Sequence, residues 1–203
     1  MKINMKELVL STRNKHKIAE ITDILKDFPV KVVSLENFKN VPRIIEDGKN
    51  LEENAIKKAS VVAKRLKKWV LADDTGLEVD YLDGRPGVYS ARWAGPGCSY
   101  ADNNRKLLKL LRAVPKNKRK AKFRCVIALS DPEGSTKTVE GMILGYIAKK
   151  VKGENGFGYD PVFVVPKYKK SFSELSTAVK NKISHRSKAL QKAKKLISKL
   201  VLN

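Results

Sequence analysis

Short apolar runs alternate with helix-patterned stretches along this sequence, and that alternation limits the possible folds more than any other feature. Leu8–Leu10 has the pattern of a buried strand, residues 11–17 form a polar turn, and Ile18, Ile21 and Leu25 then recur at helical spacing. Strand, loop and helix in this order are typical of α/β proteins. No apolar run approaches the roughly 20 residues that a membrane-spanning helix needs, so the sequence predicts no such helix and no membrane partner.

The remaining pattern predicts further strands and helices and one hairpin. These are a strand at 30–33, a helix over about 50–68, a strand at 69–72, a helix containing Leu107, Leu108 and Leu111, a hairpin of residues 123–129 with a return strand to about 148, a strand at 162–165 and a helix after Ser184. Because the hairpin is antiparallel and the first units look like crossovers, we expect an α/β fold with a mixed β-sheet and flanking helices. We expect residues 1–203 to form one domain of two lobes around a cleft, with the hairpin in the smaller lobe.

The charge balance is strongly basic. Lys and Arg number 43 against 21 Asp and Glu, which gives a formal net charge of +22. Such a surplus favours phosphate-bearing partners such as nucleotides, nucleic acid or acidic lipid. Cys98 and Cys125 have no paired Cys-x-x-Cys spacing, so neither a zinc site nor a disulfide scaffold is indicated, and Cys125 is expected in the core. The first 17 residues lack a secretory signal pattern, so we expect a cytoplasmic protein.

A polar turn, Ser11–Lys17, lies between the first expected strand and helix. Free backbone N–H groups and the helix dipole favour an anion at such a junction. The hydroxyl, amide and ammonium donors of the turn suit a phosphate chain, although the Gly-rich Walker arrangement is absent. The same residues also fit an ordinary strand-to-helix turn with solvated lysines.

A pair of carboxylates, Asp73 and Asp74, follows the apolar run 69–72 and precedes Thr75. Oxygen ligands of this kind can bind Mg²⁺, and one carboxylate can orient or deprotonate a water. Glu46 is a further oxygen donor if the fold brings it close. Paired acids are also common in plain turns.

Two later segments have side chains suited to a nucleobase. Phe157-Gly158-Tyr159-Asp160 places aromatics beside a glycine, and Ser184-His185-Arg186 precedes a helix with an imidazole and a guanidinium. In isolation, the first segment also fits core aromatics at a strand start, and the second fits a capped surface helix.

Taken in order, these segments resemble the inosine triphosphate pyrophosphatase family, also called non-canonical purine nucleoside triphosphatases. The resemblance covers nearly the whole chain. It rests on residues 11–17, Glu53-Asn54-Ala55, residues 72–77, residues 86–92, Phe157-Gly158-Tyr159-Asp160-Pro161 and Ile183-Ser184-His185-Arg186.

The resemblance implies a central nucleotide-binding cleft, a homodimer and Mg²⁺-dependent hydrolysis of ITP, dITP and XTP to the monophosphate and pyrophosphate. It implies that Asp74 is the catalytic acid-base and a metal ligand, with Glu46 as a second ligand. The substrate contacts that it implies are Thr12, Arg13, Asn14, Lys15, His16, Lys17, Thr75, Arg92, Phe157, Gly158, Tyr159, Asp160, Lys180, His185 and Arg186.

Two other functions also fit the sequence. A Maf-type pyrophosphatase of modified nucleotides belongs to the same reaction class, although its N-terminal loop differs from Ser11–Lys17. A nucleic-acid-binding protein would account for the net charge and for basic runs such as 116–122 and 192–199, but not for Asp73 and Asp74.

Overall fold

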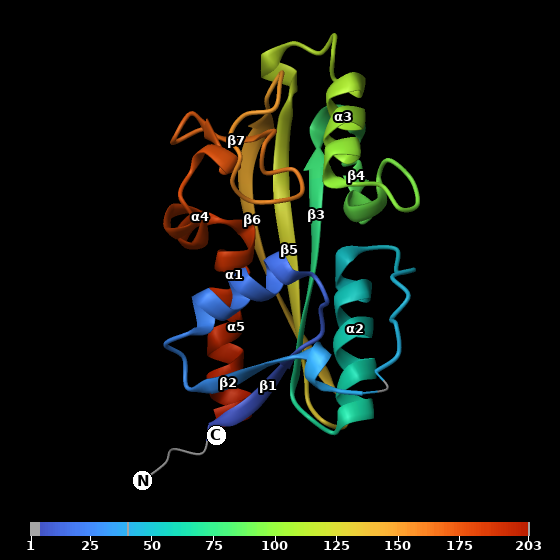
Figure 1. Cartoon of the computed structure of the whole chain (residues 1–203), viewed down its shortest axis with the longest axis vertical. Helices are drawn as coiled ribbons and strands as arrows, with labels where there is room; N and C mark the ends of the chain where they lie inside the picture. Colours follow the sequence, from blue (N-terminus) through green and yellow to red (C-terminus); the bar gives the residue numbers. More distant parts are fainter. Residues whose placement is uncertain (1–4, 40, 203) are drawn as a thin grey trace. The chain divides into compact units, whose positions relative to one another are not determined.

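A computed structural model describes residues 5–39 and 41–202 of the chain (Figure 1). Its strands are β1 (Lys6–Leu10), β2 (Val30–Ser34), β3 (Val70–Val79), β4 (Pro86–Gly87), β5 (Lys120–Ser130), β6 (Thr136–Ile147), β7 (Phe163–Val165) and β8 (Lys170–Ser171). Its α-helices are α1 (Lys15–Leu25), α2 (Leu51–Leu66), α3 (Tyr100–Leu110), α4 (Thr177–Ile183) and α5 (His185–Ile197). None of the helices in this part of the chain is long and apolar enough to cross a membrane.

The strands form one mixed sheet in the order β2-β1-β3-β5-β6-β7-β8, with β4 paired to β3. β1 is parallel to both β2 and β3, whereas β7 is antiparallel to β6 and β8. The expected α/β fold with a mixed sheet is therefore confirmed.

The chain divides into two compact units. The first unit contains the described residues up to Asp74, Cys125–Gly141 and the residues from Arg186 onward; the second contains Thr75–Arg124 and Met142–His185. The predicted placement of the whole hairpin in one lobe was wrong. β5 and β6 are 11 and 12 residues long, and their length lets the closed end of the hairpin belong to the first unit and the open end to the second.

In the first unit, helices cover both faces of the parallel strands. Leu8 and Leu10 point to a core that α1 and α5 complete with Ile21 and Ala189. Val9 points to the opposite face and is equally buried. α2 supplies that face with an apolar stripe of small side chains, Ala55, Ala59, Val62 and Ala63. Parallel strands that are buried on both faces have continuous apolar sequences, as residues 8–10 do.

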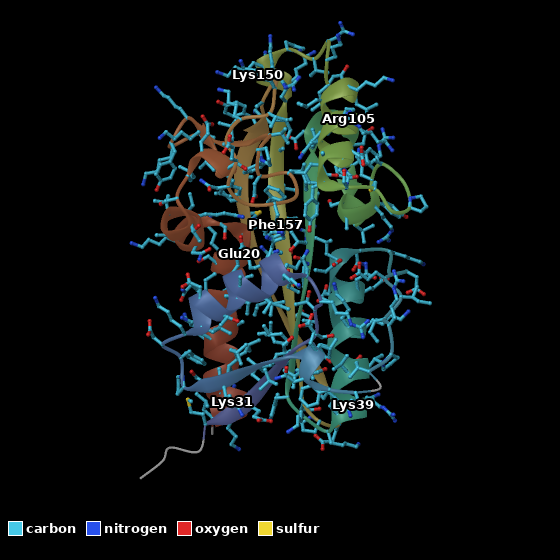
Figure 2. The ribbon with its side chains drawn as sticks, viewed as in Figure 1. Glu20, Lys31, Lys39, Arg105, Lys150 and Phe157 are labelled. Atoms are coloured by element: carbon cyan, nitrogen blue, oxygen red, sulfur yellow. The ribbon has the colours of Figure 1, made fainter. Side chains whose placement is uncertain are left out.

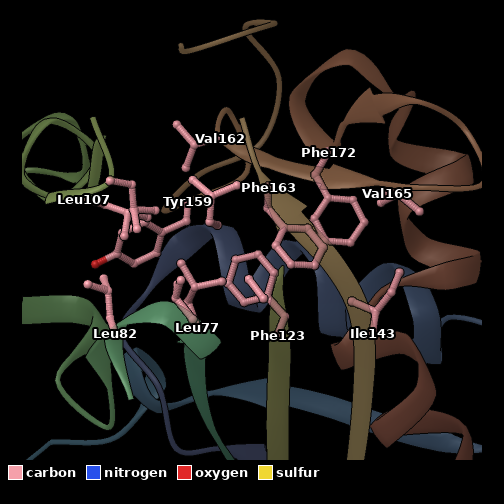
Figure 3. Packing of buried hydrophobic residues seen from close by; sticks show 14 of the residues in the cluster. Leu77, Leu82, Leu107, Phe123, Ile143, Tyr159, Val162, Phe163, Val165 and Phe172 are labelled. Carbon is pink, nitrogen blue, oxygen red and sulfur yellow. The ribbon is translucent and has the colours of Figure 1, made fainter. Parts of the chain in front are cut away.

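The core of the second unit is aromatic (Figure 3). Phe123 on β5 lies 4.6 Å from Phe163 on β7, measured between ring centroids, and Phe163 lies 5.3 Å from Phe172. Leu77 on β3 and Leu107 on α3 complete the packing on the same face of the sheet. This core fixes the strands from which the loop at 152–160 departs.

Candidate functional site

The carboxylates of Asp73 and Asp74 belong to the first unit and lie within β3. The predicted end of this strand at Ala72 was wrong, because β3 runs on to Val79. The neighbouring strand β1 pairs with β3 only as far as Leu10 opposite Leu71. Asp73 and Asp74 therefore follow the point where the parallel pair ends, which is where α/β sheets usually place functional side chains.

Asp73 is the buried anion of an ion-pair network. Its Oδ2 accepts from Arg186 Nε at 3.2 Å and Nη2 at 3.1 Å, and lies 3.0 Å from Lys17 Nζ. Arg186 also pairs with Glu20 on α1. Burial acts to raise the pKa of Asp73, but the positive charges of Lys17, Arg186 and Lys58 outweigh it and hold that pKa well below its usual range. Asp73 is therefore a permanently charged anchor and is poorly suited to accept a proton.

Asp74 has a different environment. Its Oδ1 accepts from Lys58 Nζ at 2.8 Å, and its Oδ2 accepts from Asn54 Nδ2 at 3.4 Å. Burial raises the pKa of Asp74, although Lys58 and Lys17 oppose that rise. Where the pKa values of two adjacent carboxyls are shifted in opposite directions, the one with the higher pKa is typically the group that exchanges protons, and the other stays ionised.

Lys58 is a buried cation that joins the acidic groups. Besides Asp74, its Nζ donates to Glu46 Oε1 at 3.0 Å and to the backbone oxygen of Asp73 at 2.7 Å. The burial of Lys58 acts to lower its pKa, but the charges of Asp74, Glu46 and Asp73 raise it overall, so the ammonium remains protonated. Glu46 lies in the loop before α2, and its carboxylate and that of Asp74 both accept a hydrogen bond from the same Lys58 ammonium.

The carboxylate oxygens around Lys58 Nζ are of the kind that bind a hard divalent cation. Within residues 5–39 and 41–202, no three His, Cys, Asp or Glu side chains converge as a metal site. Mg²⁺, however, is commonly held by one or two carboxylates together with substrate phosphates and water. Asp74 and Glu46 supply two carboxylates at one point, which meets that requirement.

The turn before α1 is organised by its own polar side chains. Asn14 caps α1, since its Oδ1 accepts from His16 N at 3.0 Å and Lys17 N at 3.3 Å. Thr12 Oγ1 accepts from Asn14 N at 3.2 Å. Lys15 and His16 are exposed, whereas Lys17 reaches Asp73. Lys17, one of the predicted phosphate-binding residues, is thus joined directly to the acidic cluster.

Arg13 uses its guanidinium locally. Its Nη2 donates to Val41 O at 3.2 Å, which ties the turn to the loop that contains Glu46.

In the second unit, the structure brings Phe157, Asp160 and Lys180 together. Asp160 Oδ2 accepts from Phe157 N at 2.9 Å and forms an ion pair with Lys180 Nζ. The same ammonium lies 4.8 Å from the centroid of the Phe157 ring. Gly158 O accepts from Asn104 Nδ2 at 2.9 Å, so the loop is also held by α3.

The other predicted contact residues of this unit range from buried to half-buried. Tyr159 lies in the aromatic core with its hydroxyl donating to Ser90 O at 3.0 Å, and burial raises its pKa. His185 is 3% exposed and stacks on Phe123 with ring centroids 4.5 Å apart. Arg92 lies over the ring of Tyr89 at 5.3 Å. Thr75 is half-buried on β3, directly after Asp74.

Sequence reasoning missed Lys58, Asn54 and Glu20 as site residues. A signal for the first two was present, because Asn54 and Lys58 are four residues apart on a helix and flank the apolar stripe. Both are less than a tenth exposed. Polar side chains beside a buried stripe need buried partners, and here those partners are the carboxylates.

Known proteins resemble this chain over almost its full length. Residues 8–196 match the family model described as the Ham1 family. A "dITP/XTP pyrophosphatase" of Desulforamulus reducens is 49% identical over 97% of this chain and 98% of its own length, and one of Bacillus subtilis is 48% identical over 96% and 98%.

Solved structures agree with these sequence relationships. A HAM1 protein from Coxiella burnetii, 40% identical, superimposes with a TM-score of 0.88 over 96% of this chain and 100% of its own. The Ham1 protein of Staphylococcus aureus, 42% identical, gives 0.85 over 95% and 98%. The family resemblance expected from the motifs is confirmed, and this chain belongs to the Ham1 family.

Proposed function

We propose that this chain is a nucleoside triphosphate pyrophosphatase that hydrolyses ITP, dITP and XTP to the monophosphate and pyrophosphate. The observation that carries the proposal is the Asp74 carboxyl, whose pKa is raised and which is held beside Lys58 and Glu46 in a chain about half identical to proteins named dITP/XTP pyrophosphatase. A carboxylate whose pKa is raised accepts a proton from water more readily than an ordinary one.

Asp74 orients the attacking water and accepts its proton. The water oxygen forms a bond to the α-phosphorus, the bond from that phosphorus to the bridging oxygen breaks, and pyrophosphate leaves with the electron pair. Lys17 and Lys58 stabilise negative charge that develops on the phosphates, because fixed cations in a partly buried site act more strongly than solvent. Mg²⁺, when held by Asp74 and Glu46, supplies further neutralisation of the phosphate oxygens.

The turn before α1 is proposed to bind the triphosphate chain. Thr12, Arg13, Asn14, Lys15 and His16 supply hydroxyl, guanidinium, amide, ammonium and imidazole donors there, in that order. The Asn14 side chain caps α1, so it fixes the backbone of the turn that contains the other four residues.

Residues of the second unit are proposed to contact the base and sugar. Phe157 offers a ring face, and Gly158, Asp160, Lys180 and His185 offer polar groups. A donor facing the purine O6 gains a hydrogen bond with hypoxanthine, whereas it faces the amino group of adenine and stays unsatisfied, at a cost of about 1–3 kcal/mol.

The remaining predicted contacts are given narrower roles. Thr75 and Arg92 are proposed substrate contacts, Arg92 on the phosphate side. The polar groups of Tyr159 and Arg186 are engaged by internal partners, so we assign them positioning roles, Tyr159 for its loop through Ser90 O and Arg186 for Asp73.

Product analysis tests the reaction and its selectivity together. ITP, dITP, XTP, GTP and ATP are supplied separately with Mg²⁺, and pyrophosphate is measured against orthophosphate. We expect monophosphate and pyrophosphate, with ITP, dITP and XTP far ahead of ATP and GTP. Turnover of modified pyrimidine triphosphates without turnover of these purines would instead identify a Maf-type activity.

Asp74→Asn tests the assigned base. We expect kcat to fall by about 100-fold or more, because the amide cannot accept the proton. Asp47→Asn, which alters an exposed carboxylate paired with Lys57, serves as the control and keeps normal turnover. An Asp74→Asn protein with near-normal kcat would contradict the assignment.

We also propose a homodimer and Mg²⁺ as the metal used. Light scattering coupled to size-exclusion chromatography should give twice the mass of the 22.8 kDa chain. Activity should be abolished by a chelator and restored by Mg²⁺.

A further inference from the structure

One end of the second unit is far more basic than the proposed activity requires. Segments 112–120, 147–152 and 166–170, together called the basic end, contain eleven Lys and Arg and no Asp or Glu. With 21 acidic residues in 203, a stretch of this length would ordinarily contain about two. The surplus is therefore concentrated here beyond the average of an already basic chain.

Arg119 joins the first two segments, and the third adjoins the second because Ser171 Oγ donates to Lys152 O at 2.8 Å. Ile147 N donates to Arg119 O at 2.9 Å, and the Arg119 guanidinium donates to Ile147 O at 2.7 Å and Ala148 O at 2.6 Å. Ile147 pairs with Phe163 across β6 and β7. The turn 166–170 follows β7 directly and returns as β8. Arg119 itself is 1% exposed and holds the backbone.

The other basic side chains of the basic end point to solvent. They are Arg112, Lys116, Lys118, Lys120, Lys149, Lys150, Lys152, Lys167, Lys169 and Lys170. Figure 2 labels Lys150 among them. In the described part of the chain, none of them forms an ion pair with a carboxylate. Two of these lysines act on a carboxylate without such a pair: the charges of Lys152 and Lys170 help to lower the pKa of Glu174.

Ten exposed cations gathered on three adjoining segments repel one another, and a polyanion relieves that repulsion while the counterions condensed on its own phosphates are released. We propose that the basic end binds the phosphodiester backbone of nucleic acid. This interaction is separate from the proposed nucleotide hydrolysis, whose acidic cluster is in the other unit.

The side chains between the lysines favour nucleic acid over a lipid surface. Half-buried tyrosines stand among the cations: Lys116 Nζ lies 5.4 Å from the Tyr146 ring centroid, and Lys167 Nζ lies 5.9 Å from that of Tyr168. Mixed aromatic and basic surfaces are typical of strand binding. Val151 is the one large exposed apolar side chain in the three segments as described, so the apolar face that anchors membrane-surface proteins is missing.

Fluorescence anisotropy with labelled single-stranded and duplex oligonucleotides of about 20 nucleotides tests the proposal. If about six lysines contact phosphates of the single strand, log K should fall with log salt at a slope of about −4, which is roughly 300-fold between about 50 and 200 mM. A quadruple variant, Lys149→Gln, Lys150→Gln, Lys167→Gln and Lys169→Gln, should reduce the slope to about −1.5 and weaken binding at least about tenfold at low salt.

The matched control removes the same charge from the exposed side of α5 and of the helical turn 198–202 that follows it, through Lys188→Gln, Lys192→Gln, Lys195→Gln and Lys199→Gln. We expect it to keep the slope of the unaltered chain. Equal losses in the two variants would overturn the proposal in favour of diffuse attraction, and binding to anionic phosphatidylserine vesicles without oligonucleotide binding would overturn it in favour of a lipid surface. Both variants should hydrolyse dITP at the normal rate if the hydrolysis proposal holds, which keeps the two proposals distinguishable.

Discussion

Arg119 is a buried guanidinium whose acceptors are all backbone carbonyls. It donates to Ile147 O, Ala148 O and Leu111 O, and to Val114 O at 3.4 Å. Arg119→Met keeps much of the side-chain volume but removes the guanidinium donor from all four carbonyls. Leu111 O still accepts from Val114 N at 3.0 Å, so the loss falls mainly on the other three. We expect the free energy of unfolding to fall by about 3 kcal/mol, measured by urea denaturation.

The neighbouring Lys118 provides the control for that change, because it is exposed and lies one residue away. Lys118→Met should alter stability by less than about 0.5 kcal/mol. An Arg119→Met protein as stable as Lys118→Met would mean that water replaces the guanidinium without cost.

Lys58 joins Asp74 and Glu46, so its removal leaves two carboxylates facing one another without their shared cation. We expect Lys58→Met to lower kcat by about 100-fold, the loss typical of one electrostatic group in a site. Lys58→Arg should recover part of that loss, since a cation returns although its shape differs.

Lys57 is the matched control for Lys58, since it stands next to it on α2 and pairs with exposed Asp47. Lys57→Met should turn over dITP normally. Normal kcat in Lys58→Met, with an unchanged melting temperature, would show that the ammonium has no part in the reaction.

At the scale of elements, the loop 152–160 depends on a glycine. Gly156 has φ +81°, and an added Cβ would lie 2.2 Å from Asp160 Oδ2. Gly156→Ala must therefore displace the carboxylate that holds Phe157 N and Lys180, in addition to straining the backbone. We expect a loss of about 2 kcal/mol in stability and a raised KM for dITP.

Gly84 separates those two effects. Its φ is +80°, but an added Cβ would meet nothing within 4 Å. Gly84→Ala should therefore show the backbone cost alone, about 1 kcal/mol, with KM unchanged. Identical KM values in the two variants would remove Asp160 from the proposed base contacts.

The elements that the sequence predicted well are those with strong local patterns. The helix expected over about 50–68 is α2, and the hairpin expected at 123–148 is β5 and β6. The extension of β3 beyond Ala72 was not predictable, because Asp73-Asp74-Thr75-Gly76 has turn composition and is held extended by pairing with distant strands. α4 and the two-residue strands β4 and β8 were missed for the same reason: their local signal is short.

The candidate site was predictable in its residue types and only partly in its geometry. The carboxylates and the turn 11–17 were found from order and composition. That Lys58 bridges Asp74 and Glu46, and that Arg186 is an internal partner of Asp73, depends on contacts across 12 to 113 residues of sequence. Local patterns carry no information on such contacts, so they appear only once the helices and strands are packed.

For the whole molecule, the net charge of +22 sets the response to salt. Cations outnumber anions 43 to 21, so repulsive pairs outnumber attractive ones, and screening them should stabilise the folded chain. As NaCl rises from about 0.01 M to 0.15 M, the Debye length falls from about 30 Å to 8 Å. We expect Tm to rise by about 2–4 °C, which corresponds to roughly 1 kcal/mol for a chain of this size.

The control variant that replaces Lys188, Lys192, Lys195 and Lys199 by Gln tests the cause of that rise, because it lowers the net charge without touching the buried ion pairs. Its Tm at low salt should exceed that of the unaltered chain, and its gain from added NaCl should be smaller. Surface ion pairs such as Lys31–Glu7 weaken with salt and act in the opposite direction, but each contributes only about 0–1 kcal/mol. A Tm that falls as NaCl is added would mean that these attractive pairs, rather than the surplus of lysine, dominate the stability of the chain.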